Sequence, residues 1–190
     1  MNRRSIVSVV GDAGVTPGSP HYEAAREIGR LLVDAGLRVM TGGLGGVMEA
    51  ASRGAHESPA YREGDTIGVL PQKDPQDANQ WVDIVIPTGL DYARNALVAT
   101  GDAVVAVGGG AGTLSEIAFA WMHRRLVVAL DLAGWSANLG DKRLDARIRF
   151  ADIPDDRIFA APTPKAAVAI VVERLPAYRA SRERSGERPA

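Results

Sequence analysis

The sequence predicts a single α/β domain in which a parallel sheet carries helices on both faces. A length of 190 residues suits one domain. Short runs that are apolar throughout alternate along the chain with segments of helical periodicity, which indicates a parallel sheet covered on both faces. Clusters of glycine follow two of the apolar runs, at the place where a Rossmann-like fold turns from strand to helix.

The first elements are expected to be a strand at Ser5–Val10, a turn at Gly11–Gly14 and a loop to Pro20. Apolar residues from Ala24 to Ala35 recur at helical spacing and predict a helix that Gly36 ends. The next expected elements are, in order, a strand at Arg38–Thr41, a glycine turn at Gly42–Gly46, a helix at Val47–His56, strands at Thr66–Leu70 and Ile84–Ile86, a helix that Asp91 caps and that runs to about Thr100, a strand at Asp102–Val107, a turn at Gly108–Gly112, a helix at Thr113–His123 and a strand at Leu126–Leu130.

The end of the chain is expected to close the domain with one more strand and helix. Gly134–Ala151 is expected to be loop with some helix, followed by a strand at Ile158–Phe159 and a helix at Thr163–Arg174. From Ala177 onward the sequence is polar and shows no periodicity. The domain is therefore expected to span residues 1–176, and residues 177–190 to form a frayed or disordered tail.

The composition excludes several classes of function. The chain has no cysteine, so disulfides, thiolate metal sites and cysteine nucleophiles are excluded. His21, His56 and His123 are not at metal-ligand spacing, and no metal site is expected. A net charge of −1 gives no indication of a nucleic-acid or membrane partner. No run approaches the ~20 apolar residues of a membrane span, and the first apolar run is too short for a signal peptide, so a cytoplasmic location is expected by elimination.

Two glycine-rich turns are the strongest candidates for a ligand site. The turns are Gly42-Gly43-Leu44-Gly45-Gly46 and Gly108-Gly109-Gly110-Ala111-Gly112-Thr113, each between an expected strand and helix. Glycine lets the backbone approach a ligand closely, and the free N–H groups at the start of a helix suit a phosphate. A tight turn needs one glycine, so the excess in the second turn favours phosphate binding, while the first turn leaves both interpretations open. Neither turn has the Gly-Lys-Ser/Thr of a P-loop.

Glu116 and Arg94 are candidates whose roles the residues alone leave open. Thr113-Leu114-Ser115-Glu116 fits a capping box, in which Glu116 would bond its own helix backbone, and it equally fits a functional carboxylate. Arg94 is expected in the first helical turn after Asp91, where a cation opposes the helix dipole. An anionic partner would compensate for that position, and a solvated arginine at a helix end is the alternative. Tyr92 either stacks on a base or packs as an ordinary aromatic.

These residues resemble the LOG-like superfamily, whose hallmark is Pro-Gly-Gly-x-Gly-Thr-x-x-Glu with an upstream Arg-Lys pair. Gly109-Gly110-Ala111-Gly112-Thr113 and Glu116 match the hallmark, Arg94 matches the arginine, and Gly42–Glu49 resembles the first glycine turn of the family. The resemblance covers roughly Ile6 to Leu175. Gly108 replaces the proline and Asn95 the lysine, and both changes are closer to the subfamily that includes molybdenum cofactor carriers.

The resemblance implies one of two functions for a phosphorylated, nucleotide-like ligand. The first is a phosphoribohydrolase that cleaves a nucleoside 5′-monophosphate such as AMP into base and ribose 5-phosphate. The alternative is a non-catalytic carrier of the molybdenum cofactor, whose pterin bears a phosphate. No further cofactor is required in either case, and members typically form homodimers or larger assemblies, so a dimer or tetramer is expected.

The roles that follow differ between the two functions mainly at the carboxylate. In the hydrolase, Glu116 would stabilise the oxocarbenium-like ribose and orient water, and Arg94 would keep Glu116 ionised by lowering its pKa. In the carrier no catalytic carboxylate is needed. The residues expected to bind ligand and phosphate in both cases are Gly11, Asp12, Gly42, Gly43, Gly45, Gly46, Gly109, Gly110, Gly112 and Thr113.

Overall fold

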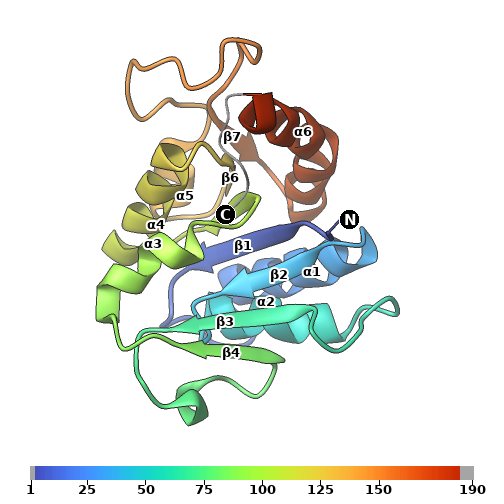
Figure 1. Ribbon diagram of the computed structural model, residues 1–190. Coiled ribbons are helices and arrows are strands. Elements are labelled where there is room, and N and C mark those ends of the chain that lie inside the picture. Colours follow the sequence, from blue (N-terminus) through green and yellow to red (C-terminus); the bar gives the residue numbers. More distant parts are fainter. Residues whose placement is uncertain (1–2, 185–190) are drawn as a thin grey trace.

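The computed structural model describes residues 3–184 and shows a seven-stranded, entirely parallel sheet in that range (Figure 1). The strands are β1 (Ile6–Gly11), β2 (Arg38–Thr41), β3 (Thr66–Leu70), β4 (Ile84–Pro87), β5 (Ala103–Val107), β6 (Leu126–Leu130) and β7 (Ile158–Ala161). Their order in the sheet is β4-β3-β2-β1-β5-β6-β7. The chain thus builds outward from β1 in one direction and then returns to its other side with β5. The fold class predicted from the sequence is confirmed.

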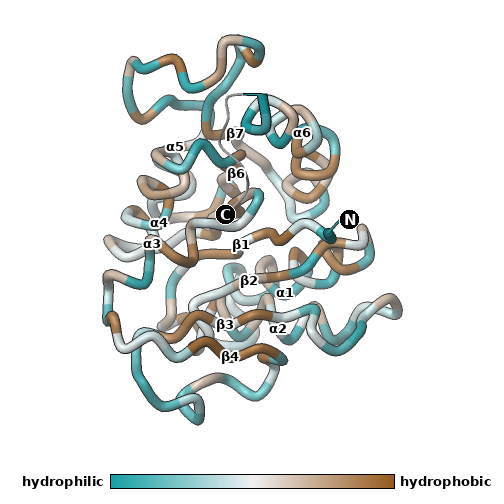
Figure 2. Tube along the Cα trace, viewed as in Figure 1, coloured by the Kyte–Doolittle hydropathy of each residue, from teal (hydrophilic) through white to brown (hydrophobic). Residues whose placement is uncertain are grey.

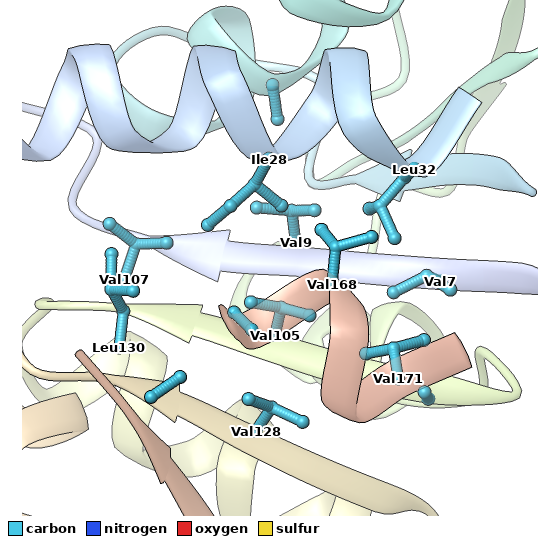
Figure 3. Packing of buried hydrophobic residues seen from close by; sticks show 14 of the residues in the cluster. Val7, Val9, Ile28, Leu32, Val105, Val107, Val128, Leu130, Val168 and Val171 are labelled. Atoms are coloured by element: carbon cyan, nitrogen blue, oxygen red, sulfur yellow. The ribbon is translucent and has the colours of Figure 1, made fainter. Parts of the chain in front are cut away.

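Helices cover the two faces of this sheet. They are α1 (Pro20–Asp34), α2 (Val47–His56), α3 (Asn95–Val98), α4 (Ala111–Met122), α5 (Trp135–Leu139) and α6 (Pro164–Arg184), with short 3₁₀ helices η1 (Pro75–Asp77) and η2 (Asp91–Arg94). Residues of α1, α2 and α6 join one core, and residues of α3 and α4 join the other. Figure 3 shows Ile28 and Leu32 of α1, with Val168 and Val171 of α6, packed on the first face.

The inner strands are largely apolar because both of their faces are buried, whereas the edge strand β4 is mostly exposed. In β5, Val105 and Val107 belong to one core while Val104 and Ala106 belong to the other, and all four are fully buried. Figure 2 shows hydrophobic residues following one another along β1, β3 and β4. This pattern requires helices on both sides of the sheet.

The ends of α1 follow from local sequence. Ser19 caps the helix by accepting a hydrogen bond from the Tyr22 N–H, and Pro20 occupies the first turn, where its missing N–H costs nothing. Gly36 follows the helix at a φ of 77°, a conformation that glycine adopts without strain. The helix thus ends where the sequence predicts.

The predicted frayed tail is wrong for residues 177–184, because α6 continues to Arg184. Tyr178 is fully buried, and its hydroxyl donates to Asp156 at 2.7 Å. Ser181 donates to Asp152 at 2.6 Å, and Arg182 is 5% exposed. The buried side of this last stretch is polar and hydrogen-bonded, which is why no apolar periodicity marks it. Residues 185–190 lie outside the described range.

The predicted cap at Asp91 is also wrong. Asp91 has a φ of 50°, and its N–H donates to the Pro71 carbonyl at 3.0 Å, so it holds a left-handed turn rather than a helix N-cap. The tight η2 turn follows and leads into α3, which contains only Asn95–Val98. Arg94 therefore lies at the junction of η2 and α3.

Candidate functional site

The main candidate site is a crevice beyond the carboxyl ends of the strands, where the chain direction across the sheet changes between β1 and β5. Its volume of about 420 Å³ falls in the range of small-molecule sites. The walls include Gly11 and Asp12 after β1, Leu44 and Met48 around the first glycine turn, Pro71 and Gln72 after β3, Asp91, Tyr92, Arg94 and Asn95 between β4 and β5, and Gly110, Gly112, Thr113 and Glu116 from the start of α4.

The N-terminus of α4 opens into this crevice. Gly110 is the N-cap residue and supplies no side-chain hydrogen bond to the helix. The first N–H groups of a helix have no partner within it, and the helix dipole places positive charge there. Gly110, Ala111 and Gly112 are exposed, so a ligand can reach this end. A helix start that is exposed in this way leaves N–H groups that an anion can use.

The turn before α4 explains why the hallmark proline is absent. Gly108 has a φ of 61° and Gly109 a φ of 87°. Proline is confined to a φ near −65°, so it cannot occupy position 108 in this turn. A Cβ on Gly108 would also lie 2.7 Å from His21 Nε2 and 2.8 Å from the Ala133 carbonyl oxygen. The conformation of this turn therefore requires glycine at position 108.

Arg94 and Glu116 form a buried ion pair on the wall of the crevice. Arg94 Nη1 donates to Glu116 Oε1 at 3.1 Å, and each side chain is only 8% exposed. Because Gly110 is the N-cap of α4, Thr113 does not cap the helix and the capping-box interpretation of Glu116 is wrong. The carboxylate instead contacts a residue 22 positions earlier in the chain.

Burial outweighs Arg94 in setting the pKa of Glu116. Desolvation raises that pKa to about 7, and the charge and hydrogen bond of Arg94 lower it by less. Arg94 thus lowers the pKa of Glu116, as expected, but burial raises it by more, so the pKa does not fall below its ordinary value. Burial also lowers the pKa of the Arg94 guanidinium.

Arg94 lines the crevice and keeps one hydrogen-bond donor without a partner among the described residues. Its Nε is buried and has no hydrogen-bond partner within residues 3–184. A buried donor without a partner is costly unless a ligand or water supplies an acceptor. The guanidinium lies directly against Gly42, where a Cβ would be 2.5 Å from Nη2 and 2.6 Å from Nη1. Gly42 thus makes room for Arg94.

The glycines of the first turn lie behind the crevice wall rather than on its surface. A Cβ on Gly46, which has a φ of 65°, would lie 2.6 Å from the Ala13 carbonyl. The Asp12 carbonyl accepts a hydrogen bond from the Val47 N–H at 3.0 Å, so this first N–H group of α2 is not available to a ligand. Gly43 packs on Leu70. Half of the residues predicted to bind ligand line the crevice: Gly11, Asp12, Gly110, Gly112 and Thr113. The other half do not line it: Gly42, Gly43, Gly45 and Gly46 of the first turn, and Gly109 of the second.

Asn95 joins the two helices that border the site. Its Nδ2 donates to Ser115 Oγ at 2.8 Å and to the Gly112 carbonyl at 3.4 Å, and the residue is 5% exposed. The sequence pointed to Asn95 only as a departure from a motif. Leu44, Met48, Pro71 and Gln72 were missed altogether, although their positions just after strand ends were a usable signal.

Within residues 3–184, no group of three or more histidine, aspartate or glutamate side chains is placed to hold a metal ion. In the same range, no helix is both long and apolar enough to cross a membrane.

Known proteins resemble this chain over most of its length. A family model described as the SLOG cluster4 family matches residues 4–168. A molybdenum cofactor binding protein from Rippkaea orientalis is 33% identical, with 90% of this chain and 97% of that chain covered at a TM-score of 0.73. A molybdenum cofactor carrier protein from Chlamydomonas reinhardtii is 30% identical, with 92% and 99% covered at a TM-score of 0.72. An uncharacterized protein of Archaeoglobus fulgidus is 39% identical over 110 residues, which are 57% of this chain and 70% of that protein.

These matches confirm the resemblance to the LOG-like superfamily that the second glycine turn suggested. The two solved structures agree with the expectation, based on Gly108 and Asn95, that the chain is closer to the cofactor-carrier-like members.

Proposed function

The chain belongs to the SLOG cluster4 family, and from this premise we propose that it binds the molybdenum cofactor through the phosphate of the pterin and acts as its carrier. The two similar structures of known ligand support this ligand class, because they are molybdenum cofactor binding and carrier proteins. The cofactor is the cargo of such a protein, so no bond in it needs to be broken.

One observation carries the proposal: the free N-terminus of α4 opens beside a buried arginine whose Nε has no partner. A phosphate provides several acceptor oxygens, and it can engage backbone N–H groups and a guanidinium together. We infer that Gly110, Gly112 and Thr113 bind the phosphate through the backbone and that Arg94 approaches it from the side. Gly11 and Asp12 complete the wall on the β1 side.

The test is direct titration of the purified protein with molybdenum cofactor released from a molybdoenzyme under anaerobic conditions. We expect saturable binding and co-purification of molybdenum and pterin from a host that makes the cofactor. Arg94→Gln should weaken binding by about ten-fold or more, because it removes a charge-assisted contact of about 1.5–3 kcal/mol. Glu116→Gln should bind within a few-fold of the unaltered protein. Absence of both titratable binding and co-purification would exclude the carrier function.

A second candidate function is hydrolysis of a nucleoside 5′-monophosphate, and one observation favours it. Glu116 lines the crevice, and a carboxyl group with a pKa of about 7 is suited to transfer protons at neutral pH. In that case the protein releases base and ribose 5-phosphate from AMP or a related monophosphate, and Glu116→Gln abolishes release while retaining binding. Failure to release base from any common nucleoside monophosphate at high protein concentration would exclude the hydrolase.

We also propose that the chain forms a homo-oligomer through the exposed edge of the sheet. Ile84 and Ile86 pair in register with Ile67 and Val69, so all four side chains lie on one face. The side chains of Ile84 and Ile86 are each 43% exposed, and that of Leu97 on α3 is 41% exposed. An apolar surface of this kind is typical of a protein–protein contact. Ile84→Asp with Ile86→Asp should lower the mass measured by light scattering, whereas the matched control Ile148→Asp on a distant loop should not.

A further inference from the structure

The crevice has a polar end at the start of α4, after β5, and a more apolar end after β3, and the strands between them set the distance from one end to the other. The start of α4 follows β5, and Pro71 follows β3. Since β1 and β2 lie between them, the two ends are three interstrand spacings apart, or about 14 Å. A phosphate bound at α4 therefore leaves the far end of the crevice for another part of the same ligand.

Apolar side chains line much of the far end, beside the polar residues Gln72 and Asp91. Leu44 and Met48 come from the first glycine turn and the start of α2, and Pro71 comes from the end of β3. Tyr92 also lines the crevice, and the hydrogen bond from the Asp91 N–H to the Pro71 carbonyl keeps its turn beside Pro71. Small-molecule sites typically combine such an apolar surface with a few polar groups that fix orientation.

Tyr92 is unusual in its exposure. Its side chain lines the crevice and is 78% exposed. The backbone before it is strained, since Asp91 adopts a φ of 50°. A large aromatic ring that is presented to a crevice by such a turn has a free face, and planar heterocycles stack favourably on tyrosine.

We propose that Tyr92 stacks on the planar heterocycle of the ligand and determines specificity for it, while the phosphate is bound at α4. This inference rests on the proposed function, because it assumes a phosphate at that helix end. The ligand then lies across the ends of β5, β1, β2 and β3, with its ring between Tyr92 and the side of the crevice that Leu44 and Met48 form. A phosphate ester without a ring uses only the polar end.

The experiment compares ligands that share a phosphate and differ in the ring. AMP and neopterin monophosphate are the ring probes, and ribose 5-phosphate is the probe without a ring, each titrated by calorimetry into unaltered protein, Tyr92→Phe and Tyr92→Ala. We expect at least one ring probe to bind the unaltered protein about ten-fold tighter than ribose 5-phosphate or more. Tyr92→Phe should retain that ratio within two-fold, and Tyr92→Ala should remove most of it while leaving ribose 5-phosphate affinity unchanged.

The outcomes separate this inference from the proposed function. If both classes of probe bind but Tyr92→Ala keeps the ratio, or if the unaltered protein shows no preference for a ring, the role of Tyr92 is overturned and the phosphate site stands. If no probe binds at millimolar concentration, the phosphate site itself is overturned. If Tyr92→Ala changes the mass measured by light scattering, Tyr92 belongs to a subunit contact, and the inference is again overturned.

Discussion

Replacing Gly110 by aspartate should block the anion site at the start of α4 without unfolding the helix. Gly110 is the N-cap of α4 and has an extended backbone, with φ −102° and ψ −150°. A Cβ placed there meets no atom within 4 Å, so the larger side chain fits. Aspartate is a preferred N-cap residue, and its carboxylate would accept the N–H groups that the phosphate needs.

The expected loss of affinity can be estimated from charge alone. Two unit negative charges about 4 Å apart repel by about 1 kcal/mol in water and about 4 kcal/mol near a protein surface. A phosphate ester carries more than one charge, so binding should weaken by well over 1.4 kcal/mol, which is about ten-fold. Stability should stay the same or rise by a few tenths of a kcal/mol, because aspartate caps slightly better than glycine and suits the helix dipole.

The assay is calorimetric titration with AMP and neopterin monophosphate, together with thermal unfolding of each variant. Gly110→Ala is the matched control, since it adds the Cβ without the charge and should bind within a few-fold of the unaltered protein. Equal affinities of Gly110→Asp and Gly110→Ala would refute phosphate binding at α4. A fall of several degrees in the melting temperature of Gly110→Asp would refute the assigned cap geometry.

Three further predictions concern the buried pair, the first glycine turn and the end of α6. The pKa of Glu116 in the folded protein is raised to about 7 from an ordinary 4.5, so between these two pH values the folded state holds a proton on Glu116 that the unfolded state releases. The stabilisation that comes from this protonation is fully present below about pH 4.5 and is lost as the pH rises through 7. Glu116→Gln should flatten that decline in urea denaturation at pH 5 and pH 8, and an unchanged slope would contradict the assignment. Gly42→Ala should displace the Arg94 guanidinium and lower ligand affinity in calorimetry, whereas Gly45→Ala, whose Cβ meets its nearest atom at 3.6 Å, should not; equal affinities would contradict the packing argument. Tyr178→Phe should cost about 1–3 kcal/mol in urea denaturation, because it leaves a buried carboxylate with one donor fewer, and a change below about 0.5 kcal/mol would mean that the end of α6 does not contribute to stability.

The parallel sheet was predictable because its central strands are buried on both faces and therefore carry nearly continuous apolar runs. The Val104–Val107 stretch of β5 supplies both cores from alternate residues. The start of α4 was predictable for a similar local reason, since a turn with positive φ at Gly108 and Gly109 requires glycine. The end of α6 was not predictable from periodicity, because its buried residues include polar ones. Tyr178, Ser181 and Arg182 are buried there, and each donates a hydrogen bond to a carboxylate far away in the sequence.

By itself the sequence determined the fold class and pointed to the start of α4, because apolar periodicity and the second glycine turn are local properties of the chain. Only the tertiary structure decided which groups meet there. In the folded chain the Glu116 carboxylate accepts a hydrogen bond from Arg94 rather than from the backbone of its own helix, and burial raises its pKa. The tertiary structure also placed Gly42 behind Arg94. These outcomes depend on contacts between residues far apart in the chain and on the water that those contacts exclude, which no local pattern records.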